Sequence, residues 1–203
     1  MNSGSITIHP ARPNAEDGLL FAHYADEAAE GSFRILLGRR AHGILAAVFV
    51  EPDHDYSYEH VLLAEAGGSV VGMAQGFRAV PGRCLANQPL LRAAGPRGRI
   101  LRWAAAAGHP LFRIHSTLRE GHFYLQFLAV EEGHRGRGIG PALIDAIEKR
   151  ARADGSLRFA VDVWDRNPRA KHLYAGHGMT AESYWPRRIV IPGFGLVRMT
   201  KPL

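Results

Sequence analysis

Apolar positions recur at helical spacing in two neighbouring segments near the start of the chain. Residues 15–30 and 33–49 both show the pattern of a helix with one buried face. The pair Gly31-Ser32 interrupts the pattern, and serine is a residue type that caps helix starts. The spacing therefore predicts two consecutive helices, the second capped by Ser32.

Strand patterns follow this helical segment. Residues 60–66 and 69–78 flank Gly67-Gly68, a dipeptide that allows the tight turn of a hairpin. Residues 51–58 are polar, and we expect a turn there. A short first strand is expected at 6–9.

The second half of the chain alternates strands and helices. Residues 123–130 are almost continuously apolar, as expected of a central strand covered on both faces, and residues 157–164 are expected to form a second buried strand. Residues 141–153 carry a single apolar stripe, which predicts an amphipathic helix. We also expect a short helix at 168–176 and two C-terminal strands near 180–190 and 195–202. This order of elements indicates an α/β fold.

Residues 81–120 differ in composition from the rest of the chain. They contain seven arginines, four prolines and one acidic residue, Glu120. We interpret them as an insertion or lid with one or two short helices, within a single domain that spans residues 1–203. The apolar side chains of this segment need a place to bury; they are Leu90, Leu91, Ile100, Leu101 and Trp103.

Composition argues against several classes of protein. Hydrophobic residues make up 46% and charged residues 22% of the chain, which are ordinary values for a globular domain. No apolar run approaches the roughly 18–20 residues of a membrane-spanning helix, and the N-terminal residues do not resemble a signal peptide. The single cysteine, Cys84, excludes an internal disulfide. We therefore expect a cytoplasmic protein with no membrane association.

The net charge of +6 comes almost entirely from arginine, since the chain has only three lysines. A basic surface can bind nucleic acid, and it can equally attract an anionic cofactor. A genome that favours arginine codons explains the same charge. We do not expect nucleic acid as a partner.

A glycine-rich stretch joins the strand at 123–130 to the helix at 141–153. Its sequence is Gly133-His134-Arg135-Gly136-Arg137-Gly138-Ile139-Gly140. Glycines at a helix start let the backbone approach an anion, which free N–H groups and the helix dipole then stabilise. The two arginines add cationic donors, so a diphosphate is the expected ligand. The spacing is neither that of Walker A nor that of the dinucleotide motif GxGxxG.

This stretch resembles a signature of the GNAT (Gcn5-related N-acetyltransferase) family. Arg135-x-x-Gly138-x-Gly140 matches the family pattern R/Q-x-x-G-x-G/A, and it follows a typical strand end, Leu128-Ala129-Val130. A later stretch is similar to the second family signature: Asn167-x-x-Ala170-x-x-Leu173-Tyr174-x-x-x-Gly178-Met179. The resemblance implies a mixed, mostly antiparallel central sheet, flanked by helices and splayed where the strands at 123–130 and 157–164 part.

The resemblance also implies an enzyme (EC 2.3.1.-) that transfers an acetyl or related acyl group from acetyl-CoA to an amine. Tyr174 would protonate the departing thiolate, although it could instead be a packed aromatic residue. Asn167 would contact pantetheine, and the N–H of Leu128 could polarise the thioester carbonyl. Pro141 departs from the pattern by removing one N–H near the phosphates. The implied cofactor-binding set is Leu128, Ala129, Val130, Arg135, Gly136, Arg137, Gly138, Ile139, Gly140, Asn167, Ala170 and Tyr174.

The general base is less clearly indicated. Many family members carry a glutamate where this chain has Gln126, and an amide cannot accept a proton at neutral pH. Gln126 could orient a water that passes the proton on, or it could be a glutamine that is merely hydrogen-bonded in a buried strand. Glu59 and His122 are the candidates for the receiving group. The acidic run at 51–60 could also face an amine, or it could be a solvated loop.

The expected acceptor is a small-molecule or peptide amine, and a homodimer is one assembly open to the chain. Two other functions stay open. One is a GNAT-like module that binds coenzyme A without catalysis, and the other is a nucleic-acid or ribosome-associated protein that uses the arginine-rich segment. The histidines form no pattern such as His-Glu-x-x-His, so no metal is expected.

Overall fold

A seven-stranded sheet forms the centre of the computed structural model, which describes residues 5–79, 88–107, 118–186 and 195–203. The strands lie in the order β1-β2-β3-β4-β5-β7-β6. Only β4 and β5 run parallel, and all other neighbours pair antiparallel. The predicted mixed, mostly antiparallel sheet is therefore confirmed. The strands are β1 (Thr7–Pro10), β2 (Val61–Ala66), β3 (Ser69–Arg78), β4 (His122–Val130), β5 (Arg158–Trp164), β6 (Thr180–Trp185) and β7 (Leu196–Pro202).

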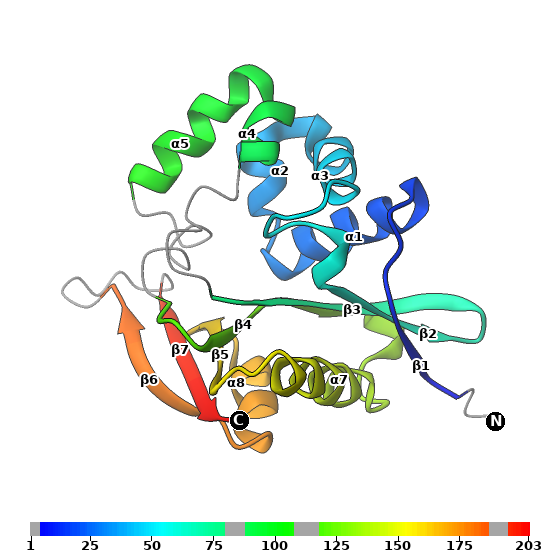
Figure 1. The fold of residues 1–203 in the computed structure, drawn as a ribbon, viewed down its shortest axis with the longest axis vertical. Helices are drawn as coiled ribbons and strands as arrows, with labels where there is room; N and C mark the ends of the chain where they lie inside the picture. The colour runs from blue at the N-terminus through cyan, green and yellow to red at the C-terminus, as the bar shows by residue number, and fades with distance from the viewer. Residues whose placement is uncertain (1–4, 80–87, 108–117, 187–194) are drawn as a thin grey trace.

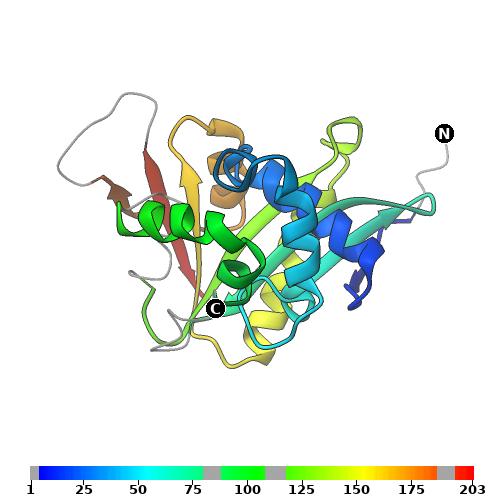
Figure 2. The same cartoon turned by 90° about the horizontal axis from the view of Figure 1, so that it is seen from above.

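Helices cover both faces of this sheet (Figure 1). One face carries α1 (Ala15–Ala28), α2 (Ser32–Leu37), α3 (Ala41–Phe49), α4 (Gln88–Ala93) and α5 (Gly98–Ala106), and the other carries α7 (Ile139–Ala153) and α8 (Pro168–Gly176). Seen from above, α1 and α3 lie over the side of β2 to β4, whereas α5 lies over the side of β5 and β7 (Figure 2). None of the helices in the described ranges is both long enough and apolar enough to cross a membrane.

The sheet separates two apolar cores. Phe21, Phe33 and Tyr56 belong to the core between the sheet and the α1 side, and Leu143 and Phe159 to the core on the α7 side. Successive strand residues point to opposite faces, so a strand between two cores must be apolar at nearly every position. This is why residues 123–130 form an almost continuous apolar run.

The predicted helix at 33–49 is wrong in one respect, because it is broken at Gly38. The chain forms α2, a 3-10 turn at Gly38–Arg40 and then α3. Gly38 has a φ of 69°, and the Arg97 guanidinium lies where a side chain at this position would project. The expected cap is also wrong: Ser32 is the first residue of α2, and the N-cap is Gly31, with no side-chain hydrogen bond.

The remaining elements agree with the sequence patterns. The hairpin turns at Gly67-Gly68, and α8 spans the predicted residues. Strand β6 ends at Trp185, so most of what was expected at 186–194, and also Cys84, lies outside the described residues.

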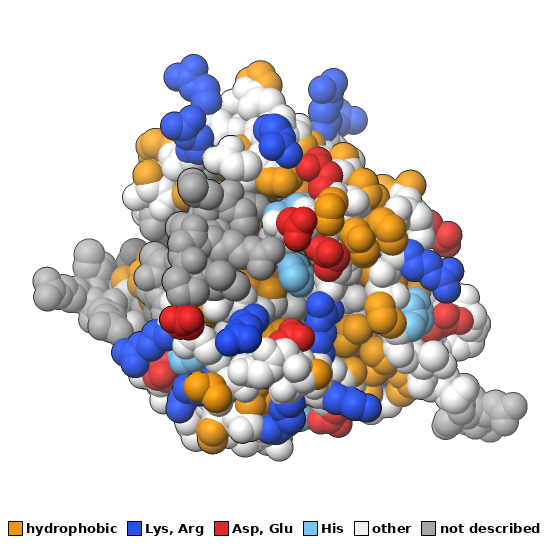
Figure 3. All heavy atoms as spheres, viewed as in Figure 1, with side chains coloured by type: hydrophobic (Ala, Val, Ile, Leu, Met, Phe, Trp, Pro, Cys, Tyr) orange, Lys and Arg blue, Asp and Glu red, His pale blue; other side chains and the backbone are white. Residues whose placement is uncertain are grey.

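The arginine-rich segment forms α4, a 3-10 turn at Gly95–Arg97 and α5, which fits the expected short helices. Leu90 and Leu101 are buried in the core on the α1 side. Ile100 and Trp103, by contrast, are 45% and 73% exposed, so the expectation that they bury is wrong. Figure 3 shows Lys and Arg side chains projecting at this end of the molecule. Residues 80–87 and 108–117 lie outside the described ranges, and the lid stays a prediction.

Candidate cofactor and active site

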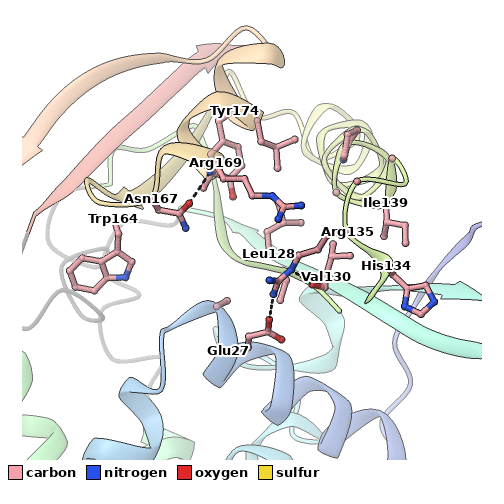
Figure 4. A pocket seen from close by; sticks show the side chains of 18 of the residues that line it. Glu27, Leu128, Val130, His134, Arg135, Ile139, Trp164, Asn167, Arg169 and Tyr174 are labelled. Carbon is pink, nitrogen blue, oxygen red and sulfur yellow. Dashed lines mark hydrogen bonds and ion pairs between the residues drawn. The ribbon is translucent and has the colours of Figure 1, made fainter. Parts of the chain in front are cut away.

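Strands β4 and β5 part in the middle of the sheet. They pair from His122 with Arg158 up to Leu125 with Val161, and no pairing follows. From there to Val130, β4 keeps a neighbour only on its β3 side. A cavity of about 570 Å³ opens beside the parted strands, a size typical of small-molecule sites (Figure 4). The predicted splay of the sheet is therefore present.

One wall of the cavity is the turn that leads into α7. Gly136 and Gly138 both have positive φ, 79° and 81°, which this tight turn requires. Helix α7 starts directly after Gly138, and no side chain caps it. The first-turn N–H groups of Ile139 and Gly140 have no acceptor within the helix, and Pro141 has no N–H. This wall can therefore donate hydrogen bonds to an anion, as the sequence predicted.

Arg135 connects this turn to α1. Its Nε donates to the carbonyl of Val130 at 2.8 Å, and its Nη2 lies 2.5 Å from Glu27 Oε1. Figure 4 shows this side chain reaching across the cavity towards α1. Arg166 forms a second such ion pair with Glu30 and lies 5.3 Å over the ring of Trp164. The two glutamates in the cavity wall are thus each balanced by an arginine.

The opposite wall is built by α8. Asn167 caps this helix, because its Oδ1 accepts the N–H of Ala170 at 2.9 Å. The carbonyl side of Asn167 is thus used locally, and its NH₂ group is left to contact a ligand. Tyr174 also lines the cavity, and burial raises the pKa of its hydroxyl well above 10. Its phenol is therefore protonated at neutral pH and can act as a donor.

Most of the predicted cofactor-binding residues line this one cavity. They are Leu128, Ala129, Val130, Arg135, Gly136, Gly138, Ile139, Gly140, Asn167, Ala170 and Tyr174. Arg137 is the exception: it is exposed and is not part of the cavity wall. Several lining residues were missed from the sequence, namely Glu27, Glu30, His134, Trp164, Arg169 and Leu173. Arg169 and Leu173 lie inside the second signature, which could have indicated them, whereas no local pattern marks Glu27 or Glu30.

Gln126 and the two candidates for accepting the proton, Glu59 and His122, do not line the cavity. Glu59 is exposed and accepts hydrogen bonds from the Asp53 N–H and the Ser57 hydroxyl. His122 begins β4; burial lowers its pKa, so its imidazole is neutral at pH 7 and able to accept a proton. Gln126 lies at a bulge of β4. Gln75 of β3 pairs with Phe127 and Gly76 pairs with Leu125, so the pairing skips Gln126.

The middle of the loop at 51–60 is buried, contrary to the simpler sequence interpretation, whereas Pro52, Asp53 and Glu59 are exposed. His54, Asp55, Tyr56 and Ser57 are all at most 2% exposed. His54 fixes the loop from inside, since its Nε2 lies 3.0 Å from the Val48 carbonyl and its Nδ1 accepts the Tyr56 N–H at 3.1 Å. Only the neutral imidazole can make both bonds, and burial lowers the pKa of His54 accordingly. The loop is therefore part of the core beside the parted strands.

Within the described ranges, no group of three or more His, Cys, Asp or Glu side chains is placed to hold a metal ion.

Parted parallel strands beside an uncapped, glycine-rich helix start form a site that suits a ligand with an anionic group. The profile of the Acetyltransferase (GNAT) family matches residues 45–179. The chain therefore belongs to the GNAT acetyltransferase family. A search of curated proteins finds no match.

Solved structures share the fold at low sequence identity. A crystal structure titled only as an acetyltransferase is 24% identical, with a TM-score of 0.69 over 97% of this chain and 98% of that one. A GNAT acetyltransferase from Streptococcus pneumoniae is 20% identical, with a TM-score of 0.58 over 98% and 99% of the chains. The NatC complex bound to Gag peptide and CoA contains a chain that is 15% identical, with a TM-score of 0.59 over 98% and 99%.

Proposed function

We propose that this protein transfers an acetyl group from acetyl-CoA to a primary amine by direct attack. The observation that carries the proposal is the cavity between the parted strands, which joins the uncapped start of α7 to the buried hydroxyl of Tyr174. The first feature suits a diphosphate, and the second suits a leaving thiolate. Membership of the family supports acetyl transfer in general.

Different parts of the cavity wall have different roles in the proposed reaction. The 135–140 turn binds the diphosphate through backbone N–H groups, and Asn167 orients the pantetheine arm with its free NH₂ group. The peptide groups of β4 from Leu128 to Val130 hold the thioester end, which supplies the activated acetyl group. As the amine attacks and the C–S bond breaks, the Tyr174 hydroxyl donates its proton to the sulfur.

The acceptor must lose a proton before or during attack. An alkylamine with a pKa of about 10.4 is neutral in only about one molecule in 2,500 at pH 7, and only the neutral form attacks. Gln126 cannot accept that proton. We propose transfer through a water to a neighbouring group, with His122 and Glu59 as the residues to test.

A panel of amines tests this function. Thiol release from acetyl-CoA is measured with spermidine, tyramine, aniline, hydrazine and a short peptide with a free N-terminus. We expect amine-dependent release from at least one of them, and only background release without amine. Tight binding of coenzyme A with no amine-dependent release in a wider panel would favour the second candidate, a CoA-binding module. The amide at position 126 is the observation that supports this second candidate.

A further inference from the structure

Three side chains at the bulge of β4 carry buried polar atoms that have no hydrogen-bond partner of normal geometry. These atoms are the Tyr56 hydroxyl, Gln75 Oε1 and both amide atoms of Gln126. Tyr56 and Gln75 are completely inaccessible to solvent. An unsatisfied buried polar group is costly, and native proteins contain few of them. Several in one place indicate that something polar is bound between them.

The three side chains come from separate segments that the fold brings together. Gln75 donates through Nε2 to the carbonyl of Asp55, the residue before Tyr56. The Tyr56 ring lies 6.4 Å from the ring of Phe127, which directly follows Gln126. The Gln126 amide lies within reach of the Tyr56 hydroxyl and acts on its pKa as a hydrogen-bond donor, but this contact falls short of normal hydrogen-bond geometry. We call these three residues the bulge cluster.

A single water matches the hydrogen-bonding capacity of the bulge cluster. The Tyr56 hydroxyl and Gln126 Nε2 are donors, and Gln75 Oε1 and Gln126 Oε1 are acceptors. A water that accepts two bonds and donates two would satisfy all four atoms, and buried waters commonly make two to four such bonds. Burial also raises the pKa of the Tyr56 phenol, so its hydroxyl keeps the proton that it would donate.

The position of the bulge cluster connects it to the chemistry. Gln126 is the first residue of β4 beyond the last pair with β5. It lies two residues before Leu128, which lines the cavity. The Tyr56 ring packs on the α1 side of the sheet, with Phe33 and Phe127. The bulge therefore lies next to the stretch of β4, Leu128 to Val130, that we propose to hold the thioester.

We propose that the bulge cluster is an internal water site, in which Tyr56 and Gln75 hold the Gln126 amide in the orientation that positions the acceptor's amino group. Tyr56 is then a positioning residue that acts through Gln126. The water site stands on the structure alone, whereas its role in positioning rests on the proposed function.

The substitution Tyr56→Phe tests the water site without any substrate. In a dry cluster the hydroxyl has at most the poorly aligned contact with Gln126, so its removal leaves the urea midpoint of unfolding unchanged or raises it. In a hydrated cluster the variant loses the bond to the water, and we expect the unfolding equilibrium constant to rise roughly five- to tenfold. Tyr24→Phe is the matched control, because the buried Tyr24 hydroxyl has a visible partner in the Val70 carbonyl at 3.1 Å. An unchanged or higher midpoint in Tyr56→Phe, in contrast to the lower midpoint of this control, overturns the proposal.

A double-substitution cycle tests the positioning role, with the amine of the panel that gives the fastest release. We expect Tyr56→Phe and Gln126→Leu each to lower kcat/KM for that amine about tenfold or more, while the Kd of coenzyme A stays unchanged. Tyr56→Phe should have no further effect in the Gln126→Leu protein, because its influence passes through that amide. Independent, multiplying effects would overturn the positioning role. Absence of turnover in the unchanged protein would instead refute the proposed function, and the urea measurement would still decide the water site.

Discussion

The Nδ1 atom of His54 accepts the backbone N–H of Tyr56 at 3.1 Å. This bond needs a neutral imidazole, because a protonated Nδ1 has no lone pair to offer. His54 is only 1% exposed, and its pKa is lowered mainly by burial. The place of Tyr56 in the core, and with it the bulge cluster, therefore depends on an uncharged histidine.

Acid should weaken the fold through this histidine. The pKa of His54 in the folded protein is lower than the unfolded value of about 6.5, so below that pH the unfolded chain takes up the proton first. We therefore expect the free energy of unfolding to fall as the pH drops from 7.5 to 5.5. His122 contributes to this fall in the same direction, because burial lowers its pKa as well. His54→Asn should be less stable at pH 7.5, but its free energy of unfolding should change less between pH 7.5 and 5.5. Urea unfolding at both pH values measures this, with the exposed His172→Asn as a control whose slope should match the unchanged protein.

Gly138→Asp should abolish tight binding of coenzyme A. A Cβ at this position meets no atom within 4 Å, so space is not limiting, and the new carboxylate would repel a phosphate. Gly138→Asn is the matched control, since asparagine tolerates the φ of 81° and carries no charge. We expect calorimetry to show that the affinity for coenzyme A falls at least tenfold in Gly138→Asp and only slightly in Gly138→Asn. Equal affinities in the two folded variants would place the diphosphate elsewhere.

Tyr174→Phe should lower kcat much more than it changes cofactor binding. General acids contribute about 10²–10⁴-fold, and a thiolate is already a fair leaving group, so we expect the lower end of this range. The Kd of coenzyme A should stay within about twofold, because the ring still fills the same space. Tyr184→Phe, at a side chain that is 60% exposed, is the control. A kcat unchanged by Tyr174→Phe would leave Tyr174 with a packing role only.

Glu27→Gln should tighten the binding of coenzyme A. The Glu27 carboxylate faces a cavity that is proposed to hold phosphates, and it occupies the Arg135 guanidinium. Removing the charge frees the arginine, and at this partly exposed site the gain is about 0.5–1 kcal/mol, or two- to fivefold in Kd. The effect should shrink in 0.5 M salt because of screening. Glu16→Gln, in the exposed first turn of α1, should leave the affinity unchanged.

Leu101→Ala and Ile100→Ala should differ sharply in stability. Leu101 is 1% exposed and belongs to the core beneath α5, whereas Ile100 is 45% exposed. We expect a loss of about 2–4 kcal/mol for Leu101→Ala and less than about 1 kcal/mol for Ile100→Ala. Thermal or urea unfolding measures both. Similar, small losses would mean that α5 is an appendage rather than a part of the core.

The periodic parts of the fold could be predicted because each is decided by local chemistry. An apolar run such as 123–130 needs cover on both faces, and a Gly-Gly pair between two strands makes a hairpin. The break at Gly38 was not predicted, because the apolar spacing of a helix continues through this position and does not reveal its φ of 69°.

The candidate site likewise contains some residues that a local sequence pattern predicts and others that only the tertiary structure brings in. Its glycine turn and the Asn167 cap are contiguous in sequence, so they carry a recognisable pattern. Glu27 enters the site only because α1 packs beside β4, more than a hundred residues from Arg135. The burial of Tyr56 likewise depends on His54 and on aromatic partners from two other elements, so a polar-looking loop became core.

The missing cap of α7 has a consequence for how this sequence can evolve. A helix start with glycine at its N-cap is less stable, by roughly a few tenths of a kcal/mol, than one capped by Ser, Thr, Asn or Asp. The φ of 81° limits position 138 to glycine or asparagine, so asparagine is the capping residue that selection for folding alone could introduce there. As long as the turn binds a diphosphate, selection acts against this replacement, because the phosphate oxygens themselves accept hydrogen bonds from the free N–H groups. Homologues that have lost the cofactor should reveal themselves by a capping side chain at position 138.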